Sequence, residues 1–308
     1  MLYATFADVK AQWKAHLAIF TANFIYGANY SVAKGIMPAH FGPFAIIFLR
    51  VAGAIILFSM LYSLKREKIH REDWGRFILC GLTGVAINQL MFFKGLSLTS
   101  PIEAAIILTA SPILVLIAAA ILAKERITIS KSFGILLGLI GALILIIQRP
   151  NVVVEGYNIW GNFMILLNAI SYAFFLVLVR PLMQKYRVGT VMLIVFIIGF
   201  IPVIPISYHE LSLVEWTIIP SWAYWGLGFI IVGTTFLAYL LNAYGLVTVS
   251  ASVVSSYIYL QPFLAASIAM MIGKDKLDFS KIISALLVFT GVYLISKPTK
   301  EKNLLKKV

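Results

Sequence analysis

Long apolar runs separated by short polar loops dominate the chain. A helix needs about 20 mostly apolar residues to cross a bilayer. The first run lacks a clear small-residue cleavage site, so we expect a retained helix and not a signal peptide. The pattern predicts ten spanning helices, at about residues 16–36, 43–64, 75–98, 101–123, 132–148, 158–180, 189–208, 222–245, 250–273 and 280–296.

The second half of the chain repeats the first. Residues 95–147 and 245–297 align without a gap at a shift of 150, with twelve identical positions. Further upstream, a shift of 146 aligns Tyr26 with Tyr172. Each half holds five predicted helices, an odd number, so the second copy must enter the membrane upside down. We therefore expect an all-α polytopic membrane protein of ten transmembrane helices, built as two inverted five-helix repeats at residues 1–148 and 149–308.

Composition indicates a chain surrounded mostly by lipid. Of the 308 residues, 61% are hydrophobic and 12% are charged, whereas a soluble domain carries about 25% charged residues. A net charge of +13 would also suit a nucleic-acid-binding protein. However, the basic residues lie in short loops between apolar runs, where the positive-inside rule accounts for them. We therefore expect a lipid bilayer as the partner, and no nucleic acid.

Lys and Arg are distributed unequally between alternate loops. Eighteen lie in the N-terminal segment, the C-terminal tail and the loops of the same side, and five lie in the other loops. This asymmetry predicts that both termini are cytoplasmic. The loop with Lys274 and Lys276 is basic although it falls on the outer side. We attribute its charge to the duplication, because it aligns with the loop that contains Lys124 and Arg126.

Residues 95–145 carry the most distinctive motifs. They include Pro112 in mid-span, Glu125-Arg126 at the end of the span and a glycine-rich segment after it, and Asp275-Lys276 repeats the charge signs of Glu125-Arg126. With these motifs the chain resembles the EamA branch of the drug/metabolite transporter superfamily over nearly its whole length. The resemblance implies an exporter of amino acids or other small metabolites in the cell (inner) membrane, with a central cavity between the halves and no cofactor. Other branches of the superfamily carry nucleotide sugars or triose phosphates by exchange.

Arg50, Lys94 and Glu103 are charged residues that fall within the predicted spans. A charge at the centre of a spanning helix costs at least ~2.5 kcal/mol, so each is a candidate for function. Arg50, which matches an arginine common in the family, could bind a substrate carboxylate in the cavity; a structural ion pair or snorkelling is the alternative. Glu103 could couple transport to protons or form an outer gate with Arg50 or Lys94. The order Ser100-Pro101-Ile102-Glu103 instead favours a helix capping box.

Proline interrupts two equivalent spans. Pro112 and Pro262 each remove a backbone donor and clash with the carbonyl of the residue four positions earlier, Leu108 and Ile258 respectively. The freed carbonyls could face a wet cavity, or the bend could let the helix act as a gate. A static kink filled by packing is the alternative, and we treat both prolines as candidate gating positions.

Uncharged polar and aromatic side chains recur at helical spacing on several spans. The predicted span at 16–36 carries Asn29 together with Asn23 and Tyr26, and in a later span Asn168 lies four residues before Tyr172. Singly, such residues often join helices, but together they predict a moderately polar cavity for a small amphipathic solute. The candidate substrate-binding residues are Asn23, Tyr26, Arg50, Asn88, Gln89, Lys94, Tyr172, Tyr239, Asn242, Tyr259 and Gln261.

The predicted span at 132–148 presents Gly134, Gly138 and Gly141, a spacing that lets helices approach closely within the chain or in a homodimer. No phosphate loop, zinc-binding motif or Gly-x-Ser-x-Gly elbow occurs, which argues against an ATP-driven pump, a metal site or an enzyme. The sequence therefore favours a secondary transporter that works by alternating access. A channel or scramblase, or a lipid-modifying membrane enzyme, is the alternative, and proton coupling, exchange and facilitated diffusion all stay open.

Overall fold

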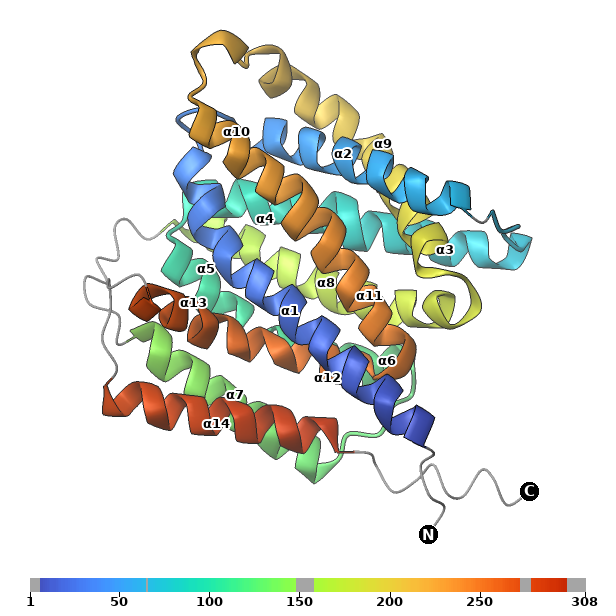
Figure 1. The fold of residues 1–308 in the computed structure, drawn as a ribbon, viewed down its shortest axis with the longest axis vertical. Coiled ribbons are helices and arrows are strands. Elements are labelled where there is room, and N and C mark those ends of the chain that lie inside the picture. Colours follow the sequence, from blue (N-terminus) through green and yellow to red (C-terminus); the bar gives the residue numbers. More distant parts are fainter. Residues whose placement is uncertain (1–5, 65, 148–157, 272–277, 298–308) are drawn as a thin grey trace.

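The chain folds into a bundle of helices. The computed structural model describes residues 6–64, 66–147, 158–271 and 278–297 of the 308, and all regular secondary structure in these ranges is helical. Consecutive segments join into ten rods within these ranges (Figure 1). The rods are α1 (Phe6–Ile36); α2 (Pro43–Leu64); α3 (Trp74–Gly81), the π-helical η2 (Leu82–Ala86) and α4 (Ile87–Leu98); α5 (Pro101–Leu108) and α6 (Ser111–Leu122); α7 (Ile129–Ile147); α8 (Ile159–Lys185); α9 (Val188–Ser212); α10 (Ser221–Gly228), the π-helical η4 (Phe229–Leu237) and α11 (Ala238–Thr248); α12 (Ala251–Ser256), the 3₁₀ turn η5 (Tyr257–Tyr259) and α13 (Leu260–Met271); and α14 (Phe279–Ser296).

Most of these rods are suited to a membrane. Eight of them, within the described part of the chain, are long and apolar enough to span a bilayer. The other two are α1, in which Asn23, Asn29 and other polar residues lower the mean hydropathy, and the rod of α12, η5 and α13. The predicted all-helical membrane fold is thus confirmed, and eight of the ten predicted spans meet this criterion.

The packing of α7 on α14 shows that the two repeats are inverted. These helices occupy equivalent positions in the two halves and lie side by side (Figure 1). A methyl carbon added at Gly134 would lie 2.8 Å from the carbonyl oxygen of Gly291, and one added at Gly141 would lie 2.8 Å from that of Ser284. The start of one helix therefore faces the end of the other, so the pair is antiparallel, as an inverted repeat requires. Gly134 and Gly141 thus serve packing within the chain, and a homodimer stays a prediction.

A second pair of contacts repeats with the shifts found in the sequence. A methyl carbon at Gly95 of α4 would lie 2.9 Å from the side chain of Ile165 in α8. One at Gly245 of α11 would lie 2.5 Å from the side chain of Ile19 in α1. Gly95 and Gly245 are 150 residues apart, and Ile19 and Ile165 are 146 apart. Each half therefore presents the same surface to the other half.

Both proline positions coincide with a break in the helix. α5 ends at Leu108 and α6 begins at Ser111, so Pro112 lies in the first turn of α6. In the second half, η5 separates α12 from α13, which contains Pro262. The first turn of a helix tolerates proline, because its N–H group would have no partner there. A gating role of these breaks stays a prediction, and the loop with Lys274, Asp275 and Lys276, which was predicted to be on the outer side, lies outside the described residues.

Figure 1 shows where these pairs lie in the molecule. α2 and α9 pack together toward one end of the long axis, and α7 and α14 lie at the other end. The middle is built by α1, α4, α5, α6, α8, α11, α12 and α13. This middle region contains both helix breaks. The two π-helical segments lead directly into two of its helices, η2 into α4 and η4 into α11.

Candidate functional site

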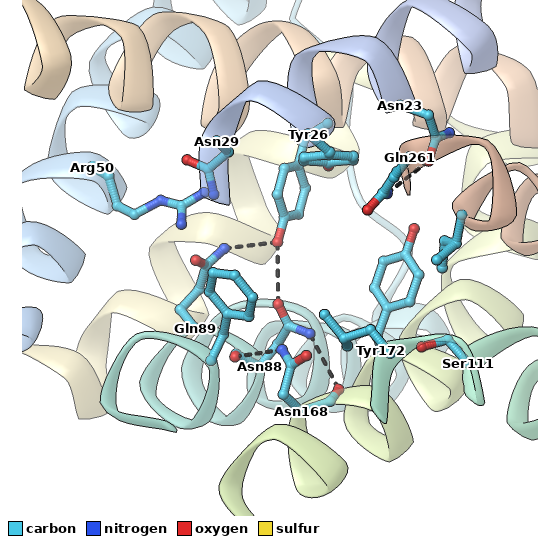
Figure 2. A pocket seen from close by; sticks show the side chains of 14 residues that line it. Asn23, Tyr26, Asn29, Arg50, Asn88, Gln89, Ser111, Asn168, Tyr172 and Gln261 are labelled. Carbon is cyan, nitrogen blue, oxygen red and sulfur yellow. Dashed lines mark hydrogen bonds between the residues drawn. The ribbon is translucent and has the colours of Figure 1, made fainter. Parts of the chain in front are cut away.

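A cavity of about 110 Å³ lies among the middle helices (Figure 2). It far exceeds the roughly 10–15 Å³ that one water needs, and it is smaller than the roughly 300–1,000 Å³ of drug-sized pockets. This central cavity therefore suits a small solute. Its lining consists of Asn23, Tyr26, Asn29, Arg50, Asn88, Gln89, Phe92, Leu108, Ser111, Asn168, Tyr172, Tyr239, Ile258 and Gln261.

The central cavity surrounds the pseudo-two-fold axis that relates the repeats. Gln89 Nε2 donates a hydrogen bond to Tyr239 Oη at 2.7 Å, and these two residues occupy equivalent positions 150 residues apart. Equivalent positions of two inverted copies can touch only near the axis that relates them. Four repeat-related pairs line the cavity: Tyr26 with Tyr172, Gln89 with Tyr239, Leu108 with Ile258, and Ser111 with Gln261.

Two π-helical segments position the residues that meet on this axis. η2 directly precedes Asn88 and Gln89, and η4 directly precedes α11 with Tyr239. A π-helical turn changes the hydrogen-bond register and therefore the direction in which the following side chains point, and such turns are frequent at functional sites. Tyr239 Oη also donates to the carbonyl oxygen of Gly84 in η2 at 3.1 Å. The two segments thus hold the contact from both sides.

Amide side chains join the walls of the central cavity. Asn168 Nδ2 donates to the carbonyl oxygen of Asn88 at 2.8 Å, and Asn88 Nδ2 donates to that of Asn168 at 3.4 Å, which links α4 to α8 (Figure 2). On the far side, Gln261 Nε2 donates to Asn23 Oδ1 at 2.8 Å and links α13 to α1. Such bonds hold these polar walls in place before any solute enters.

Arg50 of α2 is the charged residue of the lining. Its side chain is 3% exposed, its Nε donates to Thr235 Oγ1 at 2.7 Å, and its guanidinium carbon lies 4.7 Å from the ring centre of Phe93. The Thr235 hydroxyl donates its own hydrogen bond to the carbonyl oxygen of Ile230 at 2.7 Å, so it accepts from Arg50 through a lone pair. The ring face and the hydroxyl thereby fix the guanidinium in one orientation.

The chemistry of the central cavity is cationic. None of its fourteen lining residues is acidic, and Arg50 forms no ion pair with a carboxylate of the described residues. Across the same ranges, no three His, Cys, Asp or Glu side chains lie close enough together to hold a metal ion. The guanidinium makes no hydrogen bond to a described residue beyond that of Nε, so its two terminal nitrogens are available to a solute.

Two oxygens of the lining have no hydrogen-bond partner in the described structure: Asn29 Oδ1 and Ser111 Oγ. A buried polar atom left without a partner costs about 1–3 kcal/mol, and most such atoms in proteins are bonded. Figure 2 shows Asn29 beside Arg50, whereas Ser111 lies on the other side of the cavity. The lining therefore holds one unpaired oxygen near the cation and one far from it, and neither oxygen is accessible to solvent.

Most of the predicted binding residues meet here. Eight of the eleven line the central cavity, namely Asn23, Tyr26, Arg50, Asn88, Gln89, Tyr172, Tyr239 and Gln261. Asn242 lines a neighbouring cavity of about 10 Å³ that shares three tyrosines with the first. Lys94 and Tyr259 lie elsewhere: Lys94 Nζ is 5.6 Å from the ring centre of Phe44, and the fully buried Tyr259 ring faces Gly138. Substrate binding by these residues stays a prediction.

Glu103 has local partners. Its Oε2 accepts from Thr99 Oγ1 at 2.5 Å and from the backbone N–H of Ser100 at 3.4 Å, while Ser100 Oγ accepts from the Glu103 N–H at 3.1 Å. The predicted capping box is therefore present. Neither predicted ion pair, with Arg50 or with Lys94, is formed, and a role in coupling or gating stays a prediction.

Six lining residues were absent from the sequence candidates: Asn29, Phe92, Leu108, Ser111, Asn168 and Ile258. Leu108 and Ile258 are the residues whose carbonyls the prolines free, so the sequence held a signal for both. Ser111 is the repeat mate of Gln261, and the alignment of the halves could have found it. Phe92 is one of many apolar residues in its span and carries no sequence signal.

Known proteins resemble this chain along most of its length. A transporter of Bacillus subtilis, "Uncharacterized transporter YyaM", is 26% identical over 275 residues that cover 88% of this chain and 89% of its own. A WAT1-related protein of Arabidopsis thaliana is 23% identical, with 94% of this chain and 87% of its own covered. A solved crystal structure shares the fold with a TM-score of 0.72 at 19% identity, over 91% of this chain and 95% of the other.

The family assignment agrees with the repeat. Residues 13–147 and 159–297 each match the EamA-like transporter family, and the two matches divide the chain where the repeats divide it. Similar proteins named as transporters and multiple apolar helices indicate a multi-pass membrane transporter. The chain belongs to the EamA-like transporter family.

Proposed function

We propose that this protein is a secondary transporter that exports small carboxylate-bearing metabolites, with amino acids as the first class to test, by alternating access. The observation that carries the proposal is Arg50, a buried cation at the central cavity with no carboxylate partner among the described residues. A buried charge is costly unless a partner compensates it. A substrate carboxylate would supply that partner.

The geometry of Arg50 suits bidentate binding of a carboxylate. Its Nε is bonded to Thr235, which leaves the terminal nitrogens for a planar two-oxygen group. Rotation of the Asn29 amide, beside Arg50 in Figure 2, would let its buried Oδ1 accept from an adjacent ammonium group. Phe92, Leu108 and Ile258 supply apolar surface for a side chain. A cation without a carboxylate would meet Arg50 as a like charge and is disfavoured.

The repeat supplies the movement. Because the central cavity surrounds the pseudo-two-fold axis, an exchange of conformations between the halves would open the same site to the other side of the membrane. The breaks before Pro112 and Pro262 place Leu108 and Ile258 at the cavity wall. Helices that are already interrupted can bend there without loss of regular hydrogen bonds.

Matched triplets of compounds test the substrate class. Each triplet contains an amino acid, its amide and its deaminated acid, for example leucine, leucinamide and 4-methylpentanoate. Compounds that bind the folded protein raise its unfolding temperature. We expect stabilisation by amino acids or acids and none by the amides, followed by saturable uptake of the same compounds into proteoliposomes. Stabilisation by an amide equal to that by its acid would refute the carboxylate proposal.

The variants Arg50→Gln and Lys94→Gln form a matched pair, since each removes one cation from a span. Loss of a charge-assisted bidentate contact worth about 1.5–3 kcal/mol should weaken binding roughly 10- to 100-fold in Arg50→Gln. Lys94 lies outside the cavity lining, so Lys94→Gln should bind as the wild type does. Unfolding without ligand serves as the control for folding. Equal affinities of the two variants would show that Arg50 does not bind the substrate.

A further inference from the structure

A second, larger cavity opens on the surface at the end where α1 begins and α14 ends, the same side of the molecule in Figure 1. Its volume is about 590 Å³. One side belongs to α1 of the first repeat and the other to α14 of the second. We name it the terminal groove, and the lining residues that matter are Trp13, His16, Tyr257, Tyr293, Ser296 and Lys297.

The terminal groove combines exposed aromatic rings with a cation. Trp13 is 73% exposed and Tyr293 is 62% exposed, and such rings gather at the boundary between hydrocarbon and headgroups. Lys297 Nζ lies 4.8 Å from the ring centre of Tyr293, which holds the ammonium group at the groove. Lys297 makes no ion pair with any carboxylate of the described residues.

A buried hydroxyl adjoins this cation. Ser296 Oγ is inaccessible to solvent and has no hydrogen-bond partner in the part of the chain that the structure describes. The ammonium group of Lys297 suits a phosphate group, whose oxygens accept hydrogen bonds and carry negative charge. The neighbouring rings offer apolar surface to the glycerol backbone and the upper acyl chains.

We propose that the terminal groove binds an anionic phospholipid of the cytoplasmic leaflet. The loop charges predict that this end of the bundle is cytoplasmic, and anionic lipids concentrate in that leaflet. The charge of the groove is complementary to such a lipid, and its volume falls within the roughly 300–1,000 Å³ of ligand pockets. A zwitterionic lipid would fill the same space without the net attraction to Lys297.

The position of the terminal groove gives such a lipid a structural effect. Behind its opening, His16 Nδ1 and Tyr257 Oη are hydrogen-bonded at 2.7 Å, and this contact joins α1 to η5. A lipid in the groove would therefore contact both repeats next to an interface between them. Lipid binding is measured without any substrate, so the lipid proposal is tested independently of the proposed transport activity.

Short-chain lipids test the proposal on the full chain in detergent. Dioctanoyl phosphatidylglycerol and dioctanoyl phosphatidylcholine are titrated separately, and the rise in unfolding temperature gives each apparent affinity. We expect the anionic lipid to stabilise the protein at a lower concentration than the zwitterionic lipid does. Lys297→Gln should lower the apparent affinity for the anionic lipid about five-fold, which is the contribution of one basic residue near an anionic surface. Equal stabilisation by the two lipids would overturn the proposal.

Matched variants exclude a general effect of charge. Lys68 lies in an exposed loop on the side predicted to be cytoplasmic and away from the groove lining. Lys68→Gln therefore removes the same charge and should leave lipid affinity unchanged. The proposal fails if Lys297→Gln binds the anionic lipid as Lys68→Gln does.

Discussion

Replacement of Gly291 by alanine tests the antiparallel contact between α7 and α14. A methyl carbon at Gly291 would lie 2.5 Å from the carbonyl oxygen of Gly134 and 2.8 Å from the nitrogen of Gly138. Carbon atoms in contact lie about 3.5–4.0 Å apart, so the two helices must separate by roughly an ångström. Both close neighbours are backbone atoms, and no side-chain rotation can relieve the clash.

The magnitude follows from two opposing terms. Overpacking of this kind costs about 1–3 kcal/mol, while alanine is better than glycine inside a helix by about 0.5–1 kcal/mol. We therefore expect a net loss of about 1–2 kcal/mol in the free energy of unfolding. Gly228→Ala is the matched control, because a methyl carbon at Gly228 meets nothing within 4 Å, and only the favourable helix term applies to it.

Equilibrium unfolding in mixed detergent measures both free energies. Gly291→Ala should unfold more readily than the wild type, and Gly228→Ala should be at least as stable as the wild type. Because Gly134 and Gly291 form one contact, replacing both by alanine should reduce the free energy of unfolding by less than the sum of the two single reductions. If Gly291→Ala and Gly228→Ala were equally stable, the close approach of α7 and α14 would be wrong.

Three further predictions concern single hydrogen-bonding residues. Tyr239→Phe should cost about 1–3 kcal/mol of stability, because it leaves buried Gln89 Nε2 without its acceptor; chemical unfolding measures this, and an unchanged stability would contradict the contact. Glu103→Gln should leave the pH profile of transport unchanged, since glutamine also closes a capping box; a shifted profile would make Glu103 a coupling residue. Hydrogen bonds from Lys281 and Ser280 lower the pKa of Asp278 at the start of α14. The resulting stabilisation is therefore complete above the unfolded pKa of about 3.9 and is lost as pH falls through the folded value. Asp278→Asn should thus reduce the acid-induced loss of stability, and an unchanged acid titration would refute this.

The sequence predicted the helix spans and the inverted repeat better than it predicted which side of each helix faces the cavity. Apolar runs and a gap-free repeat are properties of the chain itself, so spans and inversion could be inferred. Whether a residue faces the cavity depends on helix rotation, and η2 and η4 change that rotation in a way that apolar periodicity does not show. Lys94 illustrates the limit: it follows Gln89 by five residues on the same helix, yet it contacts Phe44 and not the cavity.

The repeat also separates the symmetric parts of the central cavity from those that give it chemical character. The frame is symmetric, with the equivalent residues Tyr26 and Tyr172 both in the lining and helix breaks at equivalent positions. Such symmetry makes the two tilted arrangements of the halves similar in energy, as alternating access requires. The polar character is not symmetric. Five lining residues have apolar repeat mates: Asn23 with Ala169, Asn29 with Phe175, Arg50 with Phe196, Asn88 with Ala238, and Asn168 with Ala22.

This asymmetry has a consequence for the substrate. The apolar mates cannot offer a second cation or a second amide, so the cavity has one charged pole and not two. Phe196, the mate of Arg50, is fully buried, and its ring centre lies 5.1 Å from that of Tyr239. A solute with a carboxylate at one end therefore has one orientation that satisfies Arg50. Reversal would place its charge beside the neutral side chains of Ser111 and Gln261, where burial of an unpaired charge is costly. In the proposed mechanism, duplication would thus supply the motion, and divergence of the lining would supply the direction in which a substrate lies.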